Sequence, residues 1–180
     1  MKRRDRRGFT LVELLVVMGI VAVLVALLLP SLGAARRQAN LARARSEVAN
    51  LQSALLSYYT LYSRFPRHGS FGSGMADPEA SVSGGLQVNA ALVRMLSGED
   101  NPAGQNPRRV AFMEFPGGDG GFLDPWDRPY RYMCDFNYDS RVEISGYGGT
   151  DIELFGRSVA VWSTGPRGLD VVGDNLTSWD

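Results

Sequence analysis

The chain has 180 residues, of which 44% are hydrophobic, 10% aromatic and 21% charged, a composition that excludes a wholly disordered or collagen-like protein. Nineteen basic and nineteen acidic side chains give a net charge of zero, which argues against a uniformly basic nucleic-acid binder, and no nucleic-acid partner is expected. A single cysteine and a single histidine exclude an internal disulfide, a multi-cysteine zinc site and a His-x-x-x-His metal pair.

The charge is unevenly distributed along the chain. Nine basic and two acidic side chains lie up to Arg45, a net charge of +7, whereas the remainder carries ten basic and seventeen acidic side chains, a net charge of −7. Opposite charges at the two ends of a chain are typical of two functional parts.

The N-terminal part consists of a basic leader, Lys2 to Arg7, and an apolar run. Residues 14–29 read LLVVMGIVAVLVALLL and contain no polar side chain. Because an α-helix rises 1.5 Å per residue, about 20 residues span the roughly 30 Å core of a bilayer. The sequence predicts a membrane-spanning helix whose basic flank stays in the cytoplasm. A secretory signal peptide cut near Ala35 and a plain membrane anchor are the alternatives.

Glu13 stands directly before this apolar run. A carboxylate costs about 2.5–3.5 kcal/mol at the centre of a bilayer, and less near the interface. An acid in this position therefore indicates a function, and its charge needs a partner. The alternative is an interfacial residue that reaches the lipid headgroups.

The segment Lys2–Glu13, with the sequence KRRDRRGFTLVE, resembles the leader and cleavage site of type IV pilins and type II secretion pseudopilins. The family pattern is a basic leader, glycine, a cut, phenylalanine, Thr-Leu-Val/Ile-Glu and an apolar helix. The resemblance implies that a prepilin peptidase cuts between Gly8 and Phe9 and N-methylates Phe9. It also implies that Glu13 pairs with the N-terminal amine of a neighbouring subunit, which offsets the desolvation of both charges.

Pro30 also resembles the family, in which a proline often lies near the periplasmic end of the membrane span. Proline removes one backbone hydrogen bond and kinks or loosens a helix. The alternative is that Pro30 ends the membrane helix.

A second helical stretch is predicted up to about Tyr62. Apolar residues recur on it at steps of three and four, as in an amphipathic helix with one face on a globular domain. These residues are Leu41, Ala44, Val48, Leu51, Leu55, Tyr58 and Tyr62. The helix is expected to end before Pro66, because the residue before a proline is restricted to extended geometry.

The middle of the chain carries weaker signals. Residues 68–85 are rich in Gly, Ser and Pro and predict a loop. The segment 86–96 suits a short helix, and 110–115 suits an extended segment. The glycine cluster at 116–121 lacks the Gly-Lys-Ser/Thr ending of a phosphate-binding loop. No Ser/His/Asp, Cys/His or metal-ligand set is recognisable, so the protein is not expected to be an enzyme.

Residues 123–132, LDPWDRPYRY, resemble a segment of the major, G-type pseudopilin of type II secretion, in which glycine stands at the position of Asp127. The Asp-Pro pair begins a turn, and the aromatic residues after Pro129 indicate a strand. Residues 159–163, VAVWS, are the expected partner strand. The predicted fold class is α+β and pilin-like: a long N-terminal α-helix, membrane-spanning in its first half, packed on a small antiparallel β-sheet.

The C-terminal tail resembles the G-type C-terminus, in which a loop binds calcium through carboxylates and backbone carbonyls. The resemblance places Asp174 and Asn175 on the acidic pair and the Thr164 carbonyl among the backbone ligands, with Asp170 as a replacement carboxylate. Arg167 occupies the position of the family's first aspartate, and a guanidinium opposes calcium. A calcium site formed by these four ligands is one prediction. A metal-free loop, in which Arg167 pairs with Asp170 or Asp174, is the other.

Four parts are expected: a cleaved leader (1–8), a transmembrane and assembly helix (9–34), an amphipathic helix (35–62) and a periplasmic globular domain (63–180). The resemblance implies a structural subunit of a type II secretion pseudopilus, a periplasmic filament that drives export of folded proteins. The subunit is expected in the bacterial inner membrane, with a cytoplasmic N-terminus and a periplasmic C-terminal domain, and then in the filament.

The implied partners are further copies of the chain, the prepilin peptidase, minor pseudopilins and the inner-membrane secretion platform. The alternative is a type IV pilin or minor pilin for adhesion, motility or DNA uptake. A membrane-anchored periplasmic enzyme is a second alternative.

Overall fold

A computed structural model describes residues 9–67, 79, 82–99, 104–115, 121–168, 173 and 175–179 of the chain. The chain divides into two compact units, Met1–Asn40 and Leu41–Asp180. Helix α1, Leu11–Tyr62, contributes residues to both units. It continues through Pro30, so this proline does not end the helix.

The first unit contains the apolar part of α1, and its large apolar side chains contact no core. Those that the structure describes between Phe9 and Leu32 are 46–79% exposed. α1 is the one helix among the described residues that is long and apolar enough to cross a membrane, and none of its most apolar stretch is buried. The chain therefore leaves this surface to be covered by lipid or by another protein.

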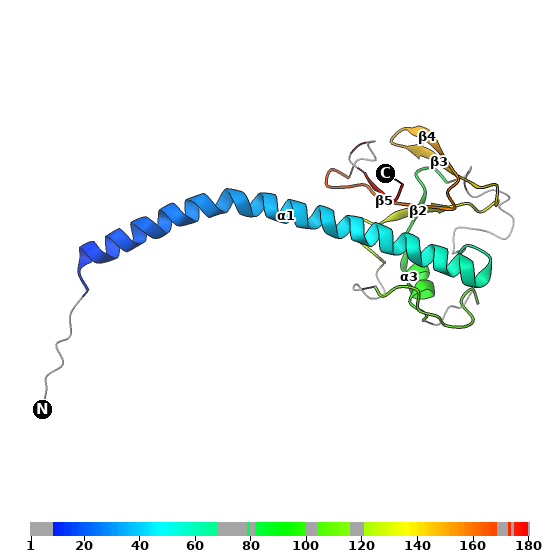
Figure 1. Cartoon of the computed structure of the whole chain (residues 1–180), viewed down its shortest axis with the longest axis horizontal. Coiled ribbons are helices and arrows are strands. Elements are labelled where there is room, and N and C mark those ends of the chain that lie inside the picture. The colour runs from blue at the N-terminus through cyan, green and yellow to red at the C-terminus, as the bar shows by residue number, and fades with distance from the viewer. Residues whose placement is uncertain are drawn as a thin grey trace, which may run out of the picture. The chain divides into compact units, whose positions relative to one another are not determined.

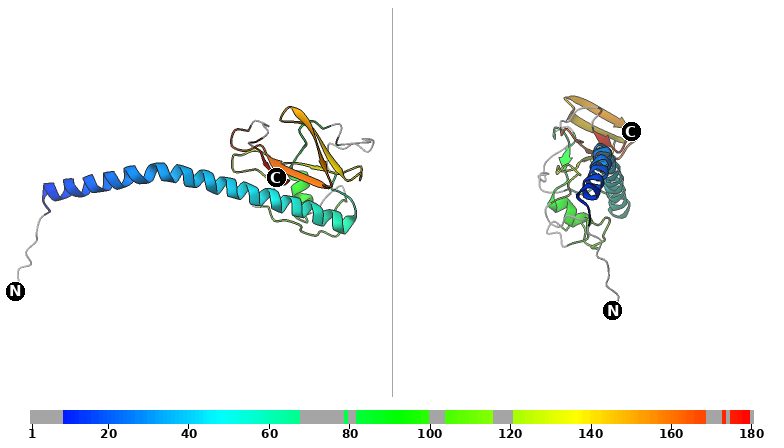
Figure 2. Two further views of the ribbon diagram at one scale, coloured as in Figure 1. Left: turned by 45° about the horizontal axis from the view of Figure 1, so that its top comes forward. Right: turned by 90° about the vertical axis from the view of Figure 1, so that its left-hand side faces the viewer.

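In the second unit, α1 buries the stripe that the sequence predicts. Ala44, Val48, Leu51, Leu55 and Tyr58 are all no more than 2% exposed. This part of α1 lies along the four-stranded sheet, with α3 beside it (Figures 1 and 2). The alternation of buried and exposed positions confirms the amphipathic helix.

Helix α1 ends at Tyr62, as predicted. Ser63 adopts a left-handed conformation with φ of +52°, and its backbone N–H donates to the carbonyl of Tyr59 at 2.7 Å. Phe65 then turns back into the core, where it stacks on Tyr59 with ring centroids 4.6 Å apart. The turn after the helix is thus fixed by packing as well as by Pro66.

The main sheet has four antiparallel strands in the order β1-β2-β5-β6. The strands are β1, Leu86–Gln87; β2, Arg131–Cys134; β5, Val159–Ser163; and β6, Leu176–Thr177. Tyr132 of β2 lies opposite Val161 of β5, so the predicted pairing of these two strands is confirmed. The α+β fold class is confirmed as well, since α1 packs against this antiparallel sheet.

The segment 86–96 differs from its prediction as one short helix. Its first two residues form β1, and only Ala90–Leu96 form helix α3. The reason is Asn89, whose side-chain oxygen accepts hydrogen bonds from the backbone of Ala91 and Leu92, both at 3.1 Å, and so caps the helix. Residues 110–115 form no strand.

A separate two-stranded sheet consists of β3, Arg141–Tyr147, and β4, Thr150–Phe155. The hairpin contacts the main sheet through β3, whose Val142, Ile144 and Tyr147 belong to the same buried core. One of its anchors is the buried carboxylate of Glu79, which accepts hydrogen bonds from the backbone N–H groups of Phe136 and Glu143. No signal in the sequence had assigned a role to Glu79.

Candidate assembly site and C-terminal loop

Glu13 lies in the first turn of α1, where it forms a reciprocal capping box with Thr10. The Glu13 carboxylate accepts hydrogen bonds from the backbone N–H and the hydroxyl of Thr10, at 3.2 and 3.0 Å. The hydroxyl of Thr10 in turn accepts one from the backbone N–H of Glu13 at 3.2 Å. Two N–H groups that a helix start leaves without partners are thereby satisfied.

Sequence reasoning assigned Glu13 a partner in another subunit and missed its partner within the chain. The pattern Thr-x-x-Glu before an apolar run is the signal that would have revealed it. All three hydrogen bonds are exposed, so they leave the carboxylate accessible to a second partner.

Of the predicted processing residues, Phe9 precedes α1 and is 75% exposed. Gly8 lies outside the described residues. The cut between them and the methylation of Phe9 stay predictions.

A polar contact connects α1 to the LDPWDRPYRY segment. The hydroxyl of Tyr130, a fully buried residue, donates to the carboxylate of Glu47 at 2.5 Å. The same carboxylate pairs with the guanidinium of Arg43 at 2.9 Å. Burial, together with the hydrogen bond and the negative charge of Glu47, raises the pKa of Tyr130, so it stays a neutral donor. The segment is thereby held against the helix.

The turn within that segment is organised by Asp124, a buried carboxylate. It accepts hydrogen bonds from the backbone N–H groups of Trp126 and Arg128, both at 3.0 Å. Asp127 has φ of +63°, a left-handed conformation. This conformation suits the glycine that stands at the same position in the similar pseudopilin segment, and aspartate tolerates it. The second oxygen of Asp124 accepts a 2.6 Å hydrogen bond from the hydroxyl of Ser163, which ties the turn to the end of β5.

The C-terminal loop begins directly after Ser163. The hydroxyl of Ser163 also accepts the backbone N–H of Gly165 at 3.0 Å. Arg128 reaches across from the turn, and its Nη1 donates to the carbonyl of Gly165 at 2.6 Å. Turn and loop are therefore joined through both a carboxylate and a guanidinium.

Two of the four predicted calcium ligands, Thr164 and Asn175, are described, and both are nearly buried. Asp170 and Asp174 lie outside the described residues. Among the residues that the structure does describe, no three or more His, Cys, Asp or Glu side chains are grouped closely enough to hold a metal ion. The predicted calcium site stays untested by this geometry.

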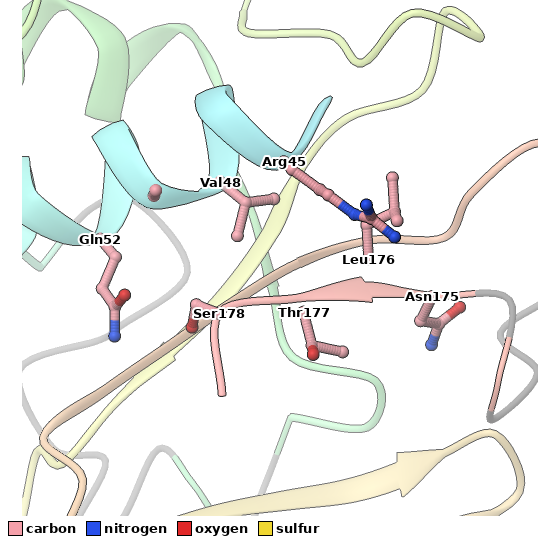
Figure 3. A pocket seen from close by; sticks show the side chains of 8 residues that line it. Arg45, Val48, Gln52, Asn175, Leu176, Thr177 and Ser178 are labelled. Atoms are coloured by element: carbon pink, nitrogen blue, oxygen red, sulfur yellow. The ribbon is translucent and has the colours of Figure 1, made fainter. Parts of the chain in front are cut away.

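Asn175 leads into β6, which forms one wall of a groove beside α1. The groove has a volume of about 490 Å³, and Figure 3 shows the helix residues on one side and the strand residues on the other. Its lining consists of Arg45, Val48, Ala49, Gln52, Asn175, Leu176, Thr177 and Ser178. The side chain of Arg45 extends across the groove toward Leu176.

The end of the chain is held by aromatic packing. The ring of Trp179 lies 5.8 Å from that of Trp162 and 5.7 Å from that of Tyr147, both in edge-on orientations. Such pairs contribute about 0.5–1.5 kcal/mol each beyond area burial. The expectation that Trp179 packs back on the domain is confirmed.

Known proteins are similar to both the N-terminal segment and the globular unit of this chain. Residues 3–29 match the family model of the prokaryotic N-terminal methylation motif. The type II secretion system core protein G of Dickeya chrysanthemi is 41% identical over 162 residues, 90% of this chain and 90% of that protein. The chain belongs to the type II secretion system core protein G family. The corresponding protein of Pectobacterium carotovorum subsp. carotovorum is 39% identical over 175 residues, 97% of this chain and 85% of that protein.

The likeness to type IV pilus components is narrower. A type IV wide pilus major component of Thermus thermophilus is 57% identical, but over 37 residues, 21% of this chain and 28% of that protein. No solved structure matches the chain. The core protein G relatives of Dickeya chrysanthemi and Pectobacterium carotovorum match along 90% and 97% of the chain, so membership rests on the globular unit as well as on the N-terminal helix.

As a core protein G, the chain is a major pseudopilin of type II secretion, a structural subunit and not an enzyme. Its apolar α1 and methylation motif are the features of a pseudopilin anchored in the inner membrane. The family and function that the sequence predicts are thus confirmed.

Proposed function

We propose that this pseudopilin assembles with further copies of itself into a periplasmic filament, in which Glu13 of one subunit pairs with the N-terminal amine of Phe9 in the next. The prepilin peptidase first cuts between Gly8 and Phe9 and methylates the new amine. The subunit then waits in the inner membrane, with its C-terminal domain in the periplasm. Minor pseudopilins and the inner-membrane secretion platform are its further partners.

One observation carries this proposal: the described part of the first unit exposes apolar side chains on every side of α1 and has one carboxylate, that of Glu13, at their start. Lipid covers such a surface in the separate subunit, and the helices of other subunits cover it in a filament. Apolar contacts alone permit many alignments of one helix against another. An ion pair in an apolar bundle selects one of them, because every other alignment leaves two charges desolvated.

The capping box supports a defined order of events. Before assembly, the carboxylate of Glu13 has hydrogen-bond donors from Thr10 within its own chain. These neutral donors lower the cost of holding a carboxylate at the edge of the bilayer. A neighbouring amine adds a full opposite charge to a carboxylate that otherwise accepts only from neutral donors, and the two charges attract each other strongly where water is excluded.

The test separates the charge of Glu13 from its role in the capping box. Glu13→Gln keeps the shape and a side-chain oxygen that can accept from Thr10, but it removes the charge. Thr10→Val removes the hydroxyl from the box and keeps the charge. Glu13→Gln is expected to be processed normally, with an intact mass that begins at methylated Phe9, and to form few or no filaments in electron micrographs. Thr10→Val is expected to retain more assembly than Glu13→Gln.

Normal filaments from Glu13→Gln would refute the charge pair, even though the protein would remain a pseudopilin. An intact mass that begins at a residue other than Phe9 would refute the processing step.

A further inference from the structure

We propose that the guanidinium of Arg128 is the cation that organises the C-terminal loop of this chain, and that the loop folds without a bound metal. The proposal concerns the globular unit alone and is independent of filament assembly. It assigns to Arg128 the part that calcium would play in the alternative prediction.

The loop contacts the guanidinium of Arg128 directly. Nη1 of Arg128 donates to the carbonyl of Gly165 at 2.6 Å. Gly168, three residues on, has φ of +66°, and a Cβ added there would lie only 1.9 Å from Cζ of Arg128. The backbone therefore approaches the guanidinium at two points of one turn, as close as the absence of a side chain permits.

The backbone of Arg128 is held in place by the turn. Its backbone N–H donates to the side chain of Asp124, and its carbonyl accepts from the backbone N–H of Asp124 at 2.7 Å. Asp124 is also bonded to Ser163 at the start of the loop. The backbone that carries the guanidinium is already ordered, so binding the carbonyl costs only the rotamer freedom of the Arg128 side chain.

The described oxygen ligands of the loop are neutral. Calcium needs six to eight oxygen ligands, several of them anionic. The described part of the loop offers the nearly buried Thr164 and Asn175, neither of which is anionic, and one of its carbonyls is already bonded to Arg128. Arg167 adds a second guanidinium within the same loop. A guanidinium bonded to a carbonyl of the loop opposes a divalent cation at the same oxygen, so Thr164, Gly165 and Asn175 do not by themselves fit calcium.

The first experiment measures thermal unfolding of the full chain in detergent, by tryptophan fluorescence, with EGTA or with added calcium chloride. The wild-type midpoint is expected to be the same in both. Arg128→Gln is expected to lower the midpoint by about 3 °C and to accelerate hydrogen exchange in 164–168, and calcium is expected to restore neither. Arg128→Lys keeps the charge but loses the planar guanidinium, and its midpoint is expected to lie between those of the wild type and Arg128→Gln.

Arg131→Gln is the matched control, because Arg131 also donates to a backbone carbonyl at 2.6 Å, but to that of Gly84, away from the loop. It is expected to leave hydrogen exchange in 164–168 unchanged.

The second experiment displaces the guanidinium without removing it. Gly168→Ala places a methyl group where the guanidinium lies, whereas Gly156→Ala introduces a methyl group at nearly the same φ, +67°, with nothing within 4 Å. The strain of the left-handed backbone is thus common to both variants. Gly168→Ala is expected to accelerate exchange in the loop more than Gly156→Ala does, and to have a smaller effect in the Arg128→Gln background.

A lower wild-type midpoint in EGTA would overturn the proposal, because it would show that calcium stabilises the fold. Equal exchange rates in 164–168 for Arg128→Gln and Arg131→Gln would overturn it as well, because the guanidinium would then hold nothing in the loop. If Arg128→Gln fails to fold, the comparison of Gly168→Ala with Gly156→Ala decides alone.

Discussion

The two parts of helix α1 treat apolar side chains in opposite ways. In the first unit, Leu24 and its neighbours are about half exposed or more, whereas Leu51 in the second unit is completely buried. The helix in the second unit is stabilised by packing within the chain. The helix in the first unit has no such packing, and its apolar surface is stabilised only when lipid or other subunits surround it.

The difference also concerns the polar groups. Glu47, in the second unit, is held by Arg43 and Tyr130 from its own chain. Glu13, in the first, bonds only to Thr10 among the described residues, and that partner is neutral. Glu47 thus has its counter-charge within the chain, whereas in the proposed filament Glu13 finds its counter-charge in another subunit.

The largest expected effect comes from removing the same side chain in each unit. Leu51→Ala is expected to lower the free energy of unfolding by about 3 kcal/mol, because it opens a cavity in the core. Leu24→Ala is expected to leave that free energy unchanged. Denaturation of the full chain in detergent, followed by tryptophan fluorescence, measures both, since all three tryptophans lie in the second unit. Equal losses of unfolding free energy in the two variants would contradict the difference in packing between the two units.

Removing the partner of Glu47 is expected to have the next largest effect. Tyr130→Phe deletes the hydroxyl that donates to this carboxylate and is expected to cost about 1–2 kcal/mol of unfolding free energy, measured in the same way. Tyr59→Phe is the control, because the Tyr59 hydroxyl makes no hydrogen bond with the described residues. A loss in the control as large as that of Tyr130→Phe would show that the Glu47 contact contributes nothing.

A smaller and purely local effect is expected at the start of the helix. Thr10→Val removes part of the capping box, which is worth about 1 kcal/mol to the first turn. Hydrogen exchange in micelles is expected to be faster at residues 11–13 only, with no change in the unfolding of the second unit. Thr60→Val, which removes a hydroxyl bonded to the carbonyl of Leu56 within the helix, is not expected to affect residues 11–13.

The smallest effect concerns pH. Burial, with the charges of Glu79 and Asp135 adding to it, raises the pKa of the Cys134 thiol. The stability that this neutral thiol provides is complete below the unfolded-state pKa of about 8.5 and is lost as the pH rises toward the folded-state value. Cys134→Ser is therefore expected to flatten the alkaline limb of a plot of unfolding free energy against pH. An alkaline limb that is the same in both proteins would exclude this role for the thiol.

Much of this architecture is predictable because local signals carry it. The apolar run, the stripe from Ala44 to Tyr58 and the pairing of β2 with β5 all follow from periodicity and turn residues. The division of 86–96 into β1 and α3 is less predictable, since it depends on how Asn89 caps the helix against a sheet formed with residues much later in the chain.

Functional and anchoring residues are likewise predictable from the sequence only where their signal is local. Glu13 stands out in the sequence because an acid beside an apolar run is unusual, and the Thr10 capping box lies within four residues of it. The anchoring of β3 by Glu79 and the contact of Arg128 with Gly165 join residues 37 or more positions apart. No local pattern specifies such contacts, because they arise only when the sheet is formed.

The most direct test of the account is a structure of the assembled filament at a resolution that shows side chains. The proposed ion pair predicts that a Glu13 carboxylate oxygen lies about 2.7–2.9 Å from the methylated amine of Phe9 in a neighbouring subunit, the distance of a charge-assisted hydrogen bond. A filament in which Glu13 contacts only its own Thr10, with no neighbouring amine in reach, would contradict it.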